Sequence, residues 1–172
     1  MEDRAAAKSH HIRAWKVSVK EGEAPRMMSE LVERDSVHGV QVLVLRAEMV
    51  FGMDHLRAAY CHAKDSIENG SSASDSIAME TLLYASGERQ LSAAIKKMSV
   101  DESTRDVVVA SLAADGLQPQ REWTPLPEAT SEATSERLLK FGISDQEART
   151  VASGRAVELI LEKVAAVDIL KK

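Results

Sequence analysis

The sequence predicts an α/β (α+β) fold, in which several helices cover a small mixed or antiparallel sheet within a single domain over residues 1–172. The chain has the length of one ordinary domain, and 44% of its residues are hydrophobic, which is enough for a core. Strand and helix patterns follow one another without the regular alternation of a doubly wound fold. The sequence contains no internal repeat with a period of about 20 to 50 residues, so it does not predict a solenoid or a propeller.

Three segments have strand patterns. Residues 12–19 mix apolar and polar side chains with one irregularity, as in a half-buried strand. Residues 40–45 (VQVLVL) are the strongest strand pattern, and residues 49–51 are expected to continue it past a bend. Residues 106–112 (DVVVASL) predict a short buried strand.

Two helices are predicted in the first half of the chain. A turn over residues 21–25, with Pro25 as a breaker, precedes a short helix over residues 26–34. Asp54 is the expected N-cap of a longer helix that ends near Gly70. The apolar positions of this second helix recur at helical spacing: Leu56, Ala59, Tyr60, Ala63 and Ile67.

A pair of helices follows a polar loop. Ser76 or Asp75 is expected to cap the first of them, and Gly87 is expected to end it because glycine costs about 1 kcal/mol in a helix interior. A fresh helix is then predicted from Glu88. The residues expected to face inward are Met79, Leu82 and Leu83 in the first helix and Leu91, Ala94, Ile95 and Met98 in the second.

The last third of the chain begins with a loop. Residues 115–135 are rich in Pro, Ser, Thr and Glu, which predicts a flexible loop, with residues 121–124 as a candidate edge strand. Ser144 and Glu147 have the spacing of a capping box and predict a helix as far as Ser153.

A terminal amphipathic helix is predicted over residues 155–170. Such a helix packs on the sheet in most domains, but it can also bury part of its stripe in a partner. Ile169 lies off the main stripe and suggests a second apolar side. The stripe itself consists of Val157, Ile160, Leu161, Val164 and Val167.

Charge and composition limit the classes of partner. The 22 basic and 27 acidic residues give a net charge of −5, whereas a DNA-binding protein usually needs a basic excess to neutralise phosphates. The apolar runs are far shorter than the roughly 20 residues of a membrane-spanning helix. A single cysteine, Cys61, fits a reducing compartment, and we expect a cytoplasmic protein, or a nuclear one in a eukaryote. We therefore expect neither DNA nor a membrane as a partner.

The motifs of common active sites are missing from the sequence. It contains no phosphate-binding glycine loop, no nucleophile elbow and no HExxH zinc motif. His55, Cys61 and His62 share one predicted helix, but a zinc site needs three or four ligands in suitable geometry, and we interpret them as exposed histidines and a packed thiol. The sequence therefore predicts no catalytic residue, no cofactor, no metal and no enzymatic activity.

One local cluster of polar residues suggests an anion site. If a helix restarts after Gly87, its unpaired backbone N–H groups lie beside Arg89 and Gln90, and Lys96 and Lys97 follow about two turns later. The alternative is an ordinary helix pair whose apolar side chains face the core, with Arg89 paired to Glu80 or another carboxylate.

Two stretches resemble a known family. They are HLxxAxxxA over residues 55–63 and MExLLxxSGxRQLxxAI over residues 79–95. Both resemble the kinase-binding subunit of the KEOPS complex. This family of subunits includes the eukaryotic PRPK-binding protein and its archaeal counterparts. The terminal VELILEKVAAVDIL resembles the closing helix of that family. The resemblance does not clearly cover the first ten residues or residues 115–135, and Leu91 replaces the usual isoleucine.

The resemblance implies a non-catalytic subunit of an archaeal-type complex. It implies that the protein binds and regulates a small atypical kinase/ATPase subunit, which in turn holds the threonylcarbamoyltransferase subunit, and that it helps recruit tRNA by the 3′ CCA end for threonylcarbamoyladenosine modification. On this basis Arg89, Gln90, Lys96 and Lys97 are the predicted tRNA contacts, and the stripe of the terminal helix is the predicted kinase interface.

Two other classes of function stay open at this point. A stand-alone small-ligand or nucleotide-binding domain would use the corner at residues 87–90. A hydrolase-like enzyme would need a cleft with converging carboxylates or a metal.

Overall fold

The computed structural model describes residues 12–113, 116–129, 133–152 and 154–171. It confirms an α+β fold with one four-stranded sheet. The strands β1 (Arg13–Ser18), β2 (Val42–Arg46), β3 (Asp106–Ser111) and β4 (Thr124–Pro125) lie in the order β2-β3-β1-β4. Every neighbouring pair is antiparallel.

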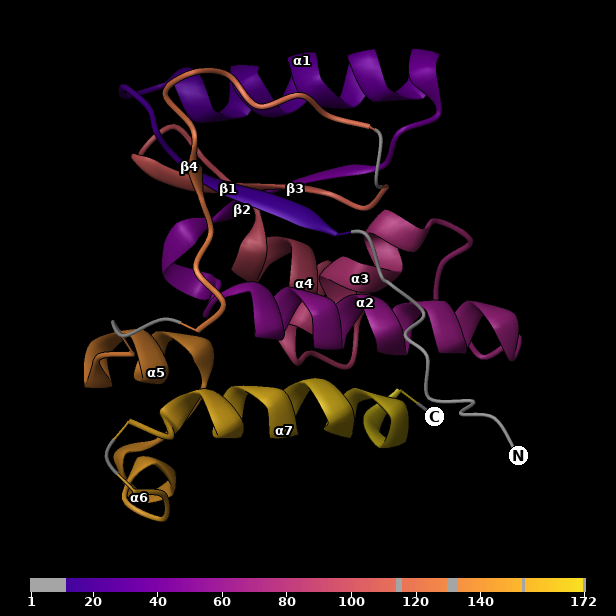
Figure 1. Cartoon of the computed structure of the whole chain (residues 1–172). Coiled ribbons are helices and arrows are strands. Elements are labelled where there is room, and N and C mark those ends of the chain that lie inside the picture. The colour runs from indigo at the N-terminus through magenta and orange to yellow at the C-terminus, as the bar shows by residue number, and fades with distance from the viewer. Residues whose placement is uncertain (1–11, 114–115, 130–132, 153, 172) are drawn as a thin grey trace, which may run out of the picture.

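The elements form four layers (Figure 1). Helix α1 (Glu23–His38) covers one face of the sheet, and α2 (Met53–Glu68), α3 (Ile77–Ser86) and α4 (Leu91–Met98) cover the other. The helices α5 (Ser135–Phe141), α6 (Asp145–Ala148) and α7 (Ala156–Leu170) form the outermost layer.

Alternating side chains of the strands feed two separate cores. On the α1 side, Trp15 and Val17 of β1 pack with Val107 and Val109 of β3. On the α2 side, Ala14 and Val108 belong to a larger cluster that includes most buried residues of α2, α3 and α7. The sheet is thus buried on both faces, although all its pairs are antiparallel.

Helix α1 is longer than the predicted short helix over residues 26–34. It begins at Glu23, so the prediction of Pro25 as a breaker was wrong. Proline is tolerated in the first turn of a helix, because the N–H group that it lacks has no intrahelical partner there.

The predicted continuation of β2 over residues 49–51 was also wrong. A short 3₁₀ helix, η1 (Ala47–Met49), replaces it. The guanidinium group of Arg137 donates hydrogen bonds to the carbonyl groups of Ala47, Glu48 and Val50 over 2.9–3.1 Å, which holds this segment in a tight turn.

The start of α2 differs from the predicted cap at Asp54. The helix begins at Met53, and the N–H groups of Met53 and Asp54 donate to the carbonyl groups of Pro127 and Glu128 at 2.9 and 3.0 Å. Gly52 before it has φ +102°, and a Cβ there would lie 2.6 Å from the Glu128 carbonyl oxygen. A distant backbone segment therefore caps this helix in place of a side chain.

The boundaries around α3 agree better with the sequence. Ser76 caps α3 and accepts a hydrogen bond from the Met79 N–H group, and Gly87 ends the helix in the left-handed conformation at φ +68°. The following helix starts at Leu91, three residues after the predicted start at Glu88.

The C-terminal part contains one helix that the sequence analysis missed. Helix α5 lies where no element was predicted. The capping box of Ser144 and Glu147 is confirmed. The helix that it opens, α6, ends at Ala148 and not at the predicted Ser153. The predicted edge strand over residues 121–124 is reduced to β4, because residues 121–122 form a turn. The predicted flexible loop over residues 115–135 lies partly outside the described residues.

Helix α7 is confirmed, but it does not pack on the sheet. It lies against α2 and α3, on the side of these helices away from the strands (Figure 1). No helix in the described part of the chain is long and apolar enough to cross a membrane.

Candidate interaction sites

The corner between α3 and α4 is held by side-chain hydrogen bonds and ends in exposed polar residues. The hydroxyl of Ser86 donates to the carbonyl of Leu83 at 2.7 Å and accepts from the N–H group of Glu88 at 3.1 Å. Arg89 and Gln90 follow on the surface, and the side chain of Arg89 makes no hydrogen bond or ion pair with another residue in the described part of the chain.

The four predicted tRNA contacts are not equivalent. Lys96 is exposed on α4, as are Arg89 and Gln90 before it, whereas the side chain of Lys97 is only 14% exposed. The Lys97 ammonium group donates to the carbonyl of Ser86 at 2.6 Å and to the carboxylate of Glu88 at 3.0 Å. Lys97 therefore holds the corner together, and three of the four residues are available to a ligand.

Lys97 also contacts an aromatic ring. Its ammonium nitrogen lies 4.0 Å from the ring centre of Phe141, a cation–π contact that links α4 to α5. Burial lowers the pKa of Lys97, and the hydrogen bond to Glu88 opposes that shift.

The alternative partner considered for Arg89, the carboxylate of Glu80, is occupied elsewhere. Glu80 is fully buried and accepts hydrogen bonds from the ammonium group of Lys171 at 2.6 Å and from the hydroxyl of Ser66 at 3.1 Å. Its second oxygen accepts from the N–H groups of Ala73 and Ser74 at 3.0 and 3.2 Å. The carboxylate is fully partnered without Arg89.

A polar network surrounds this ion pair and fixes the end of α7. Asp168 accepts hydrogen bonds from the hydroxyl of Tyr84 and pairs with the ring of His62 at 2.8 Å. Burial lowers the pKa of Lys171, but the hydrogen bonds to Glu80 and Tyr84 outweigh it and leave the pKa raised.

The predicted kinase stripe divides into two parts. Ile160, Val164 and Val167 are completely buried against the domain's own core, whereas Val157 and Leu161 are partly exposed. Ile169 is 75% exposed, as its position off the stripe predicts. Only the partly exposed and exposed members are accessible to a partner in the folded domain, and the role of the stripe in kinase binding stays a prediction.

The interpretation of His55 as an exposed histidine was wrong. The residue is fully buried in α2, where its Nδ1 accepts from the N–H group of Phe51 at 3.2 Å and its Nε2–H donates to the carbonyl of Ala85 at 2.8 Å. Burial lowers the pKa of His55 to about 4.

The other two residues of the His–Cys cluster have different surroundings. His62 is half-buried in its pair with Asp168, and burial raises the pKa of the Cys61 thiol, which keeps it protonated. In the described part of the chain, no group of three or more His, Cys, Asp or Glu residues could hold a metal ion.

An apolar groove, which the sequence analysis did not identify, runs beside the edge strand β2. It has a volume of about 350 Å³ between α1, β2, α3 and α4. Val32 and Ile95 both line it and are 50% and 40% exposed, so two large apolar side chains of one groove are open to a partner. Met28 and Met79 also line it and supply adaptable apolar surface.

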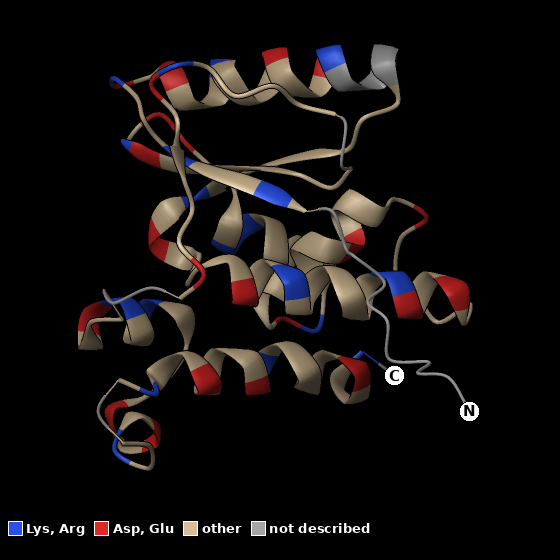
Figure 2. Cartoon of the chain, in the orientation of Figure 1, with Lys and Arg blue, Asp and Glu red and all other residues tan. Residues whose placement is uncertain are grey.

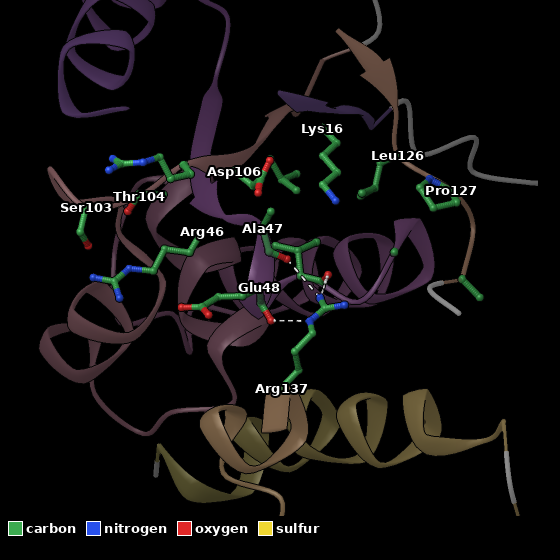
Figure 3. Close-up of a pocket in the computed structure, with 15 residues that line it drawn as sticks. Lys16, Arg46, Ala47, Glu48, Ser103, Thr104, Asp106, Leu126, Pro127 and Arg137 are labelled. Carbon is green, nitrogen blue, oxygen red and sulfur yellow. Dashed lines mark hydrogen bonds between the residues drawn. The ribbon is translucent and has the colours of Figure 1, made fainter. Parts of the chain in front are cut away.

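A second, polar cavity of about 680 Å³ opens at the end of the sheet (Figure 3). Its residues come from β1, the end of β2, η1, the residues before and at the start of β3, the segment after β4 and α5, so no local motif could reveal it. Several basic side chains line this cavity. Along the rest of the chain, Lys and Arg are interspersed with Asp and Glu (Figure 2).

An α+β domain that carries an apolar groove and a basic cavity offers two surfaces on which other molecules can bind. A comparison with family models identifies the kind of binding protein to which the chain belongs. Residues 22–141, which are 120 of the 172 residues, match the model of kinase binding protein CGI-121, and the chain belongs to that family. No curated protein matched the chain in a separate comparison.

The family match confirms the kinase-binding part of the resemblance found in the sequence. It covers the apolar groove and the α3–α4 corner. It ends at Phe141, so α6 and α7 lie outside it.

Proposed function

We propose that this protein is a non-catalytic subunit of an archaeal-type KEOPS complex. In that role it binds and regulates the small atypical kinase/ATPase subunit, and the threonylcarbamoyltransferase subunit is an indirect partner through the kinase. It also helps recruit tRNA by the 3′ CCA end for threonylcarbamoyladenosine modification in the cytoplasm. The observation that carries the proposal is the match to a kinase-binding family over most of the chain.

The apolar groove is the best-supported kinase surface. It offers exposed apolar side chains, as the desolvated centre of a protein interface requires, and all of its lining lies within the matched residues. The terminal helix is the competing surface, through Leu161 and Ile169. The two surfaces lie on different layers of the molecule, so single substitutions can separate them.

Co-purification with the kinase subunit of the same organism tests the proposal. A stable complex of the two full chains is expected, and a chain that binds no kinase would favour the stand-alone ligand-binding alternative. Val32→Glu and Ile95→Glu are expected to weaken the complex at least tenfold, because each places a charge in a desolvated contact.

Matched variants locate the surface. Leu139→Glu changes an apolar residue that is 62% exposed on α5, outside both surfaces, and is expected to leave kinase binding unchanged. Ile169→Glu tests the terminal helix in the same way. Loss of binding on Ile169→Glu, with normal binding of the groove variants, would move the interface to α7.

The proposed tRNA contact involves Arg89, Gln90 and Lys96. They place two cations and an amide on one corner, next to the start of α4. The net charge of −5 implies weak tRNA binding by the isolated subunit, with affinity that falls as salt rises.

A further inference from the structure

The apolar groove runs along an open edge of the sheet. Strand β2 is the outermost strand in the order β2-β3-β1-β4, so one of its two sides has no neighbouring strand. Residues 40–45 line the groove, and they include nearly all of this strand. An open edge carries backbone N–H and C=O groups that can pair with a further strand.

The register of the sheet shows which backbone groups of β2 point to the open side. In an antiparallel pair, residues alternately bond to the neighbouring strand and point away from it. Val42 is aligned with Ser111 of β3. One residue earlier, the carbonyl of Gln41 accepts a hydrogen bond from the N–H group of Leu112 at 2.9 Å. Because Gln41 bonds to the β3 side, the N–H and C=O groups of Val42 point to the open side.

These two backbone groups of Val42 lack a partner within the domain. They make no hydrogen bond with another residue that the structure describes. Val42 is nevertheless only 6% exposed, so the groups lie in a largely apolar surrounding. A shielded backbone group without a hydrogen bond is costly, and this position therefore favours a partner that supplies both a donor and an acceptor.

The other end of the same edge already pairs with an extended segment of the chain itself. Ser99, which follows α4, has an extended backbone and forms an isolated antiparallel bridge with Leu45. The guanidinium group of Arg46 donates to the Ser99 carbonyl and pairs with Asp101, which fastens that segment to the strand. The edge thus accepts strand pairing at Leu45 and leaves Val42 open.

The groove has apolar walls on both faces of the sheet. Helix α1 contributes Met28 and Val32 on one face, and α3 and α4 contribute Met79 and Ile95 on the other (Figure 1). None of the described residues that line the groove is charged. A strand that enters the groove is therefore buried on both faces and needs a nearly continuous run of uncharged, apolar residues.

We propose that the kinase partner contributes an extended apolar segment, which pairs with β2 through the backbone of Val42. This inference rests on the proposed kinase-binding role of the groove and specifies how the groove is recognised. The backbone hydrogen bonds of the added strand provide affinity, and its alternate side chains contact the two walls. A helix can fill apolar space as well, but its backbone groups bond within the helix and leave Val42 unpaired.

Val42→Pro tests the backbone contact. Proline removes the N–H group that points to the open side, and the ladder with β3 does not use that group. The affinity for the purified kinase subunit, measured by calorimetry, is expected to fall about tenfold or more, because a carbonyl of the partner loses its donor. Val42→Ala keeps the N–H group and shortens a side chain that belongs to the core on the α1 side, so a loss of less than about threefold is expected.

Amide hydrogen exchange of the parent chain gives a measurement that does not depend on the folding of a variant. The Val42 amide is expected to exchange at least about tenfold more slowly in the kinase complex than in the free chain, because it gains a hydrogen bond. The Leu43 amide already faces β3 and is expected to change much less. Thermal melting checks that Val42→Pro is folded, and if it is not, the exchange result decides.

The outcomes separate this inference from the proposed function. If the parent chain binds no kinase, both fail. If the parent binds but a folded Val42→Pro binds as tightly as Val42→Ala, or if the Val42 amide gains no protection, strand pairing is overturned and the kinase-binding role stands. Dimerisation of the free chain that light scattering detects and Val42→Pro abolishes would also overturn the inference, because a second copy would then occupy the edge.

Discussion

The junction of α2, α3 and α7 and the cavity at the end of the sheet use charged residues in opposite ways. At the junction, Glu80 and Lys171 are 0% and 7% exposed and are bound to each other and to neighbouring polar groups. At the cavity, Lys16 has no partner among the described residues. A buried charge needs its partners inside the domain, so its removal affects folding, whereas an exposed unpaired charge affects mainly what approaches from outside.

The same difference divides the basic residues of the α3–α4 corner. Lys97 belongs with the buried and partnered group, and its neighbour Lys96 belongs with the exposed group. Adjacent lysines in the sequence therefore have different expected functions. The following changes test this division, beginning with the largest expected effect.

Removal of the buried carboxylate is expected to have the largest effect. Glu80→Ala leaves the ammonium group of Lys171 buried without its counterion and frees two backbone N–H groups. The expected loss is about 3–5 kcal/mol in the free energy of unfolding, measured by urea denaturation.

The double variant Glu80→Leu with Lys171→Met provides the control. It removes both charges and fills the same space, so much of the lost stability is expected to return. A loss below about 1 kcal/mol for Glu80→Ala would show that the junction tolerates an unpaired charge and would contradict the division.

Acidification is expected to destabilise the domain through His55. The pKa of this residue is about 4 in the folded protein, because burial disfavours the charged ring, and about 6.5 in an unfolded chain. The unfolded state therefore binds more protons than the folded state between these two pH values. The contribution of the neutral His55 to the free energy of unfolding is fully present above pH 6.5 and is lost as the pH falls toward 4. The difference between the two pKa values corresponds to about 3 kcal/mol in the free energy of unfolding.

Urea denaturation at several pH values measures this effect, and His55→Asn is the comparison variant. The asparagine does not titrate, so the unfolding free energy of this variant is expected to fall less than that of the parent between pH 6.5 and 5. Glu147 does not disturb this window, because backbone and side-chain hydrogen bonds from Ser144 and Lys163 lower its pKa to about 2. Equal slopes for the parent and the variant would show that another group titrates.

The two lysines of α4 provide a smaller and more local test. Lys97→Met keeps the length of the side chain but leaves the carbonyl of Ser86 without its donor, at an expected cost of about 1–2 kcal/mol. Lys96→Met is expected to change the free energy of unfolding by less than about 0.5 kcal/mol. Similar effects of the two variants on thermal unfolding would erase the distinction within the corner.

The sequence predicted those features that depend on local patterns. The three main strands, the cap at Ser76, the helix end at Gly87 and the capping box at Ser144 all follow from neighbouring residues. The backbone cap of α2 and the bend at η1 depend on residues 127–128 and on Arg137, which are distant in sequence. Periodicity carries no information about such contacts.

The candidate sites were less predictable than the fold for the same reason. The exposed corner at Arg89 and Gln90 was identified because its residues are adjacent in the chain. The stripe of α7 was identified as apolar, but its pattern could not distinguish a helix buried on α2 from one that binds a partner. The groove and the cavity each combine several segments, and no single segment carries a signal for them.

The smallest expected effect on folding is that of Arg89→Glu. Arg89 is exposed and makes no hydrogen bond or ion pair with another described residue, so the free energy of unfolding is expected to change by less than about 0.5 kcal/mol. The same variant is expected to weaken tRNA binding by the assembled complex, since a phosphate contact becomes a repulsion, and to leave kinase binding intact. Filter binding at two salt concentrations measures the tRNA affinity, and thermal melting checks the fold. Lys64→Glu on α2 changes the charge in the same way away from the corner and serves as the control. A large loss of thermal stability would show that Arg89 is structural after all, and an unchanged melting temperature with unchanged tRNA affinity would remove this residue from the proposed tRNA contact.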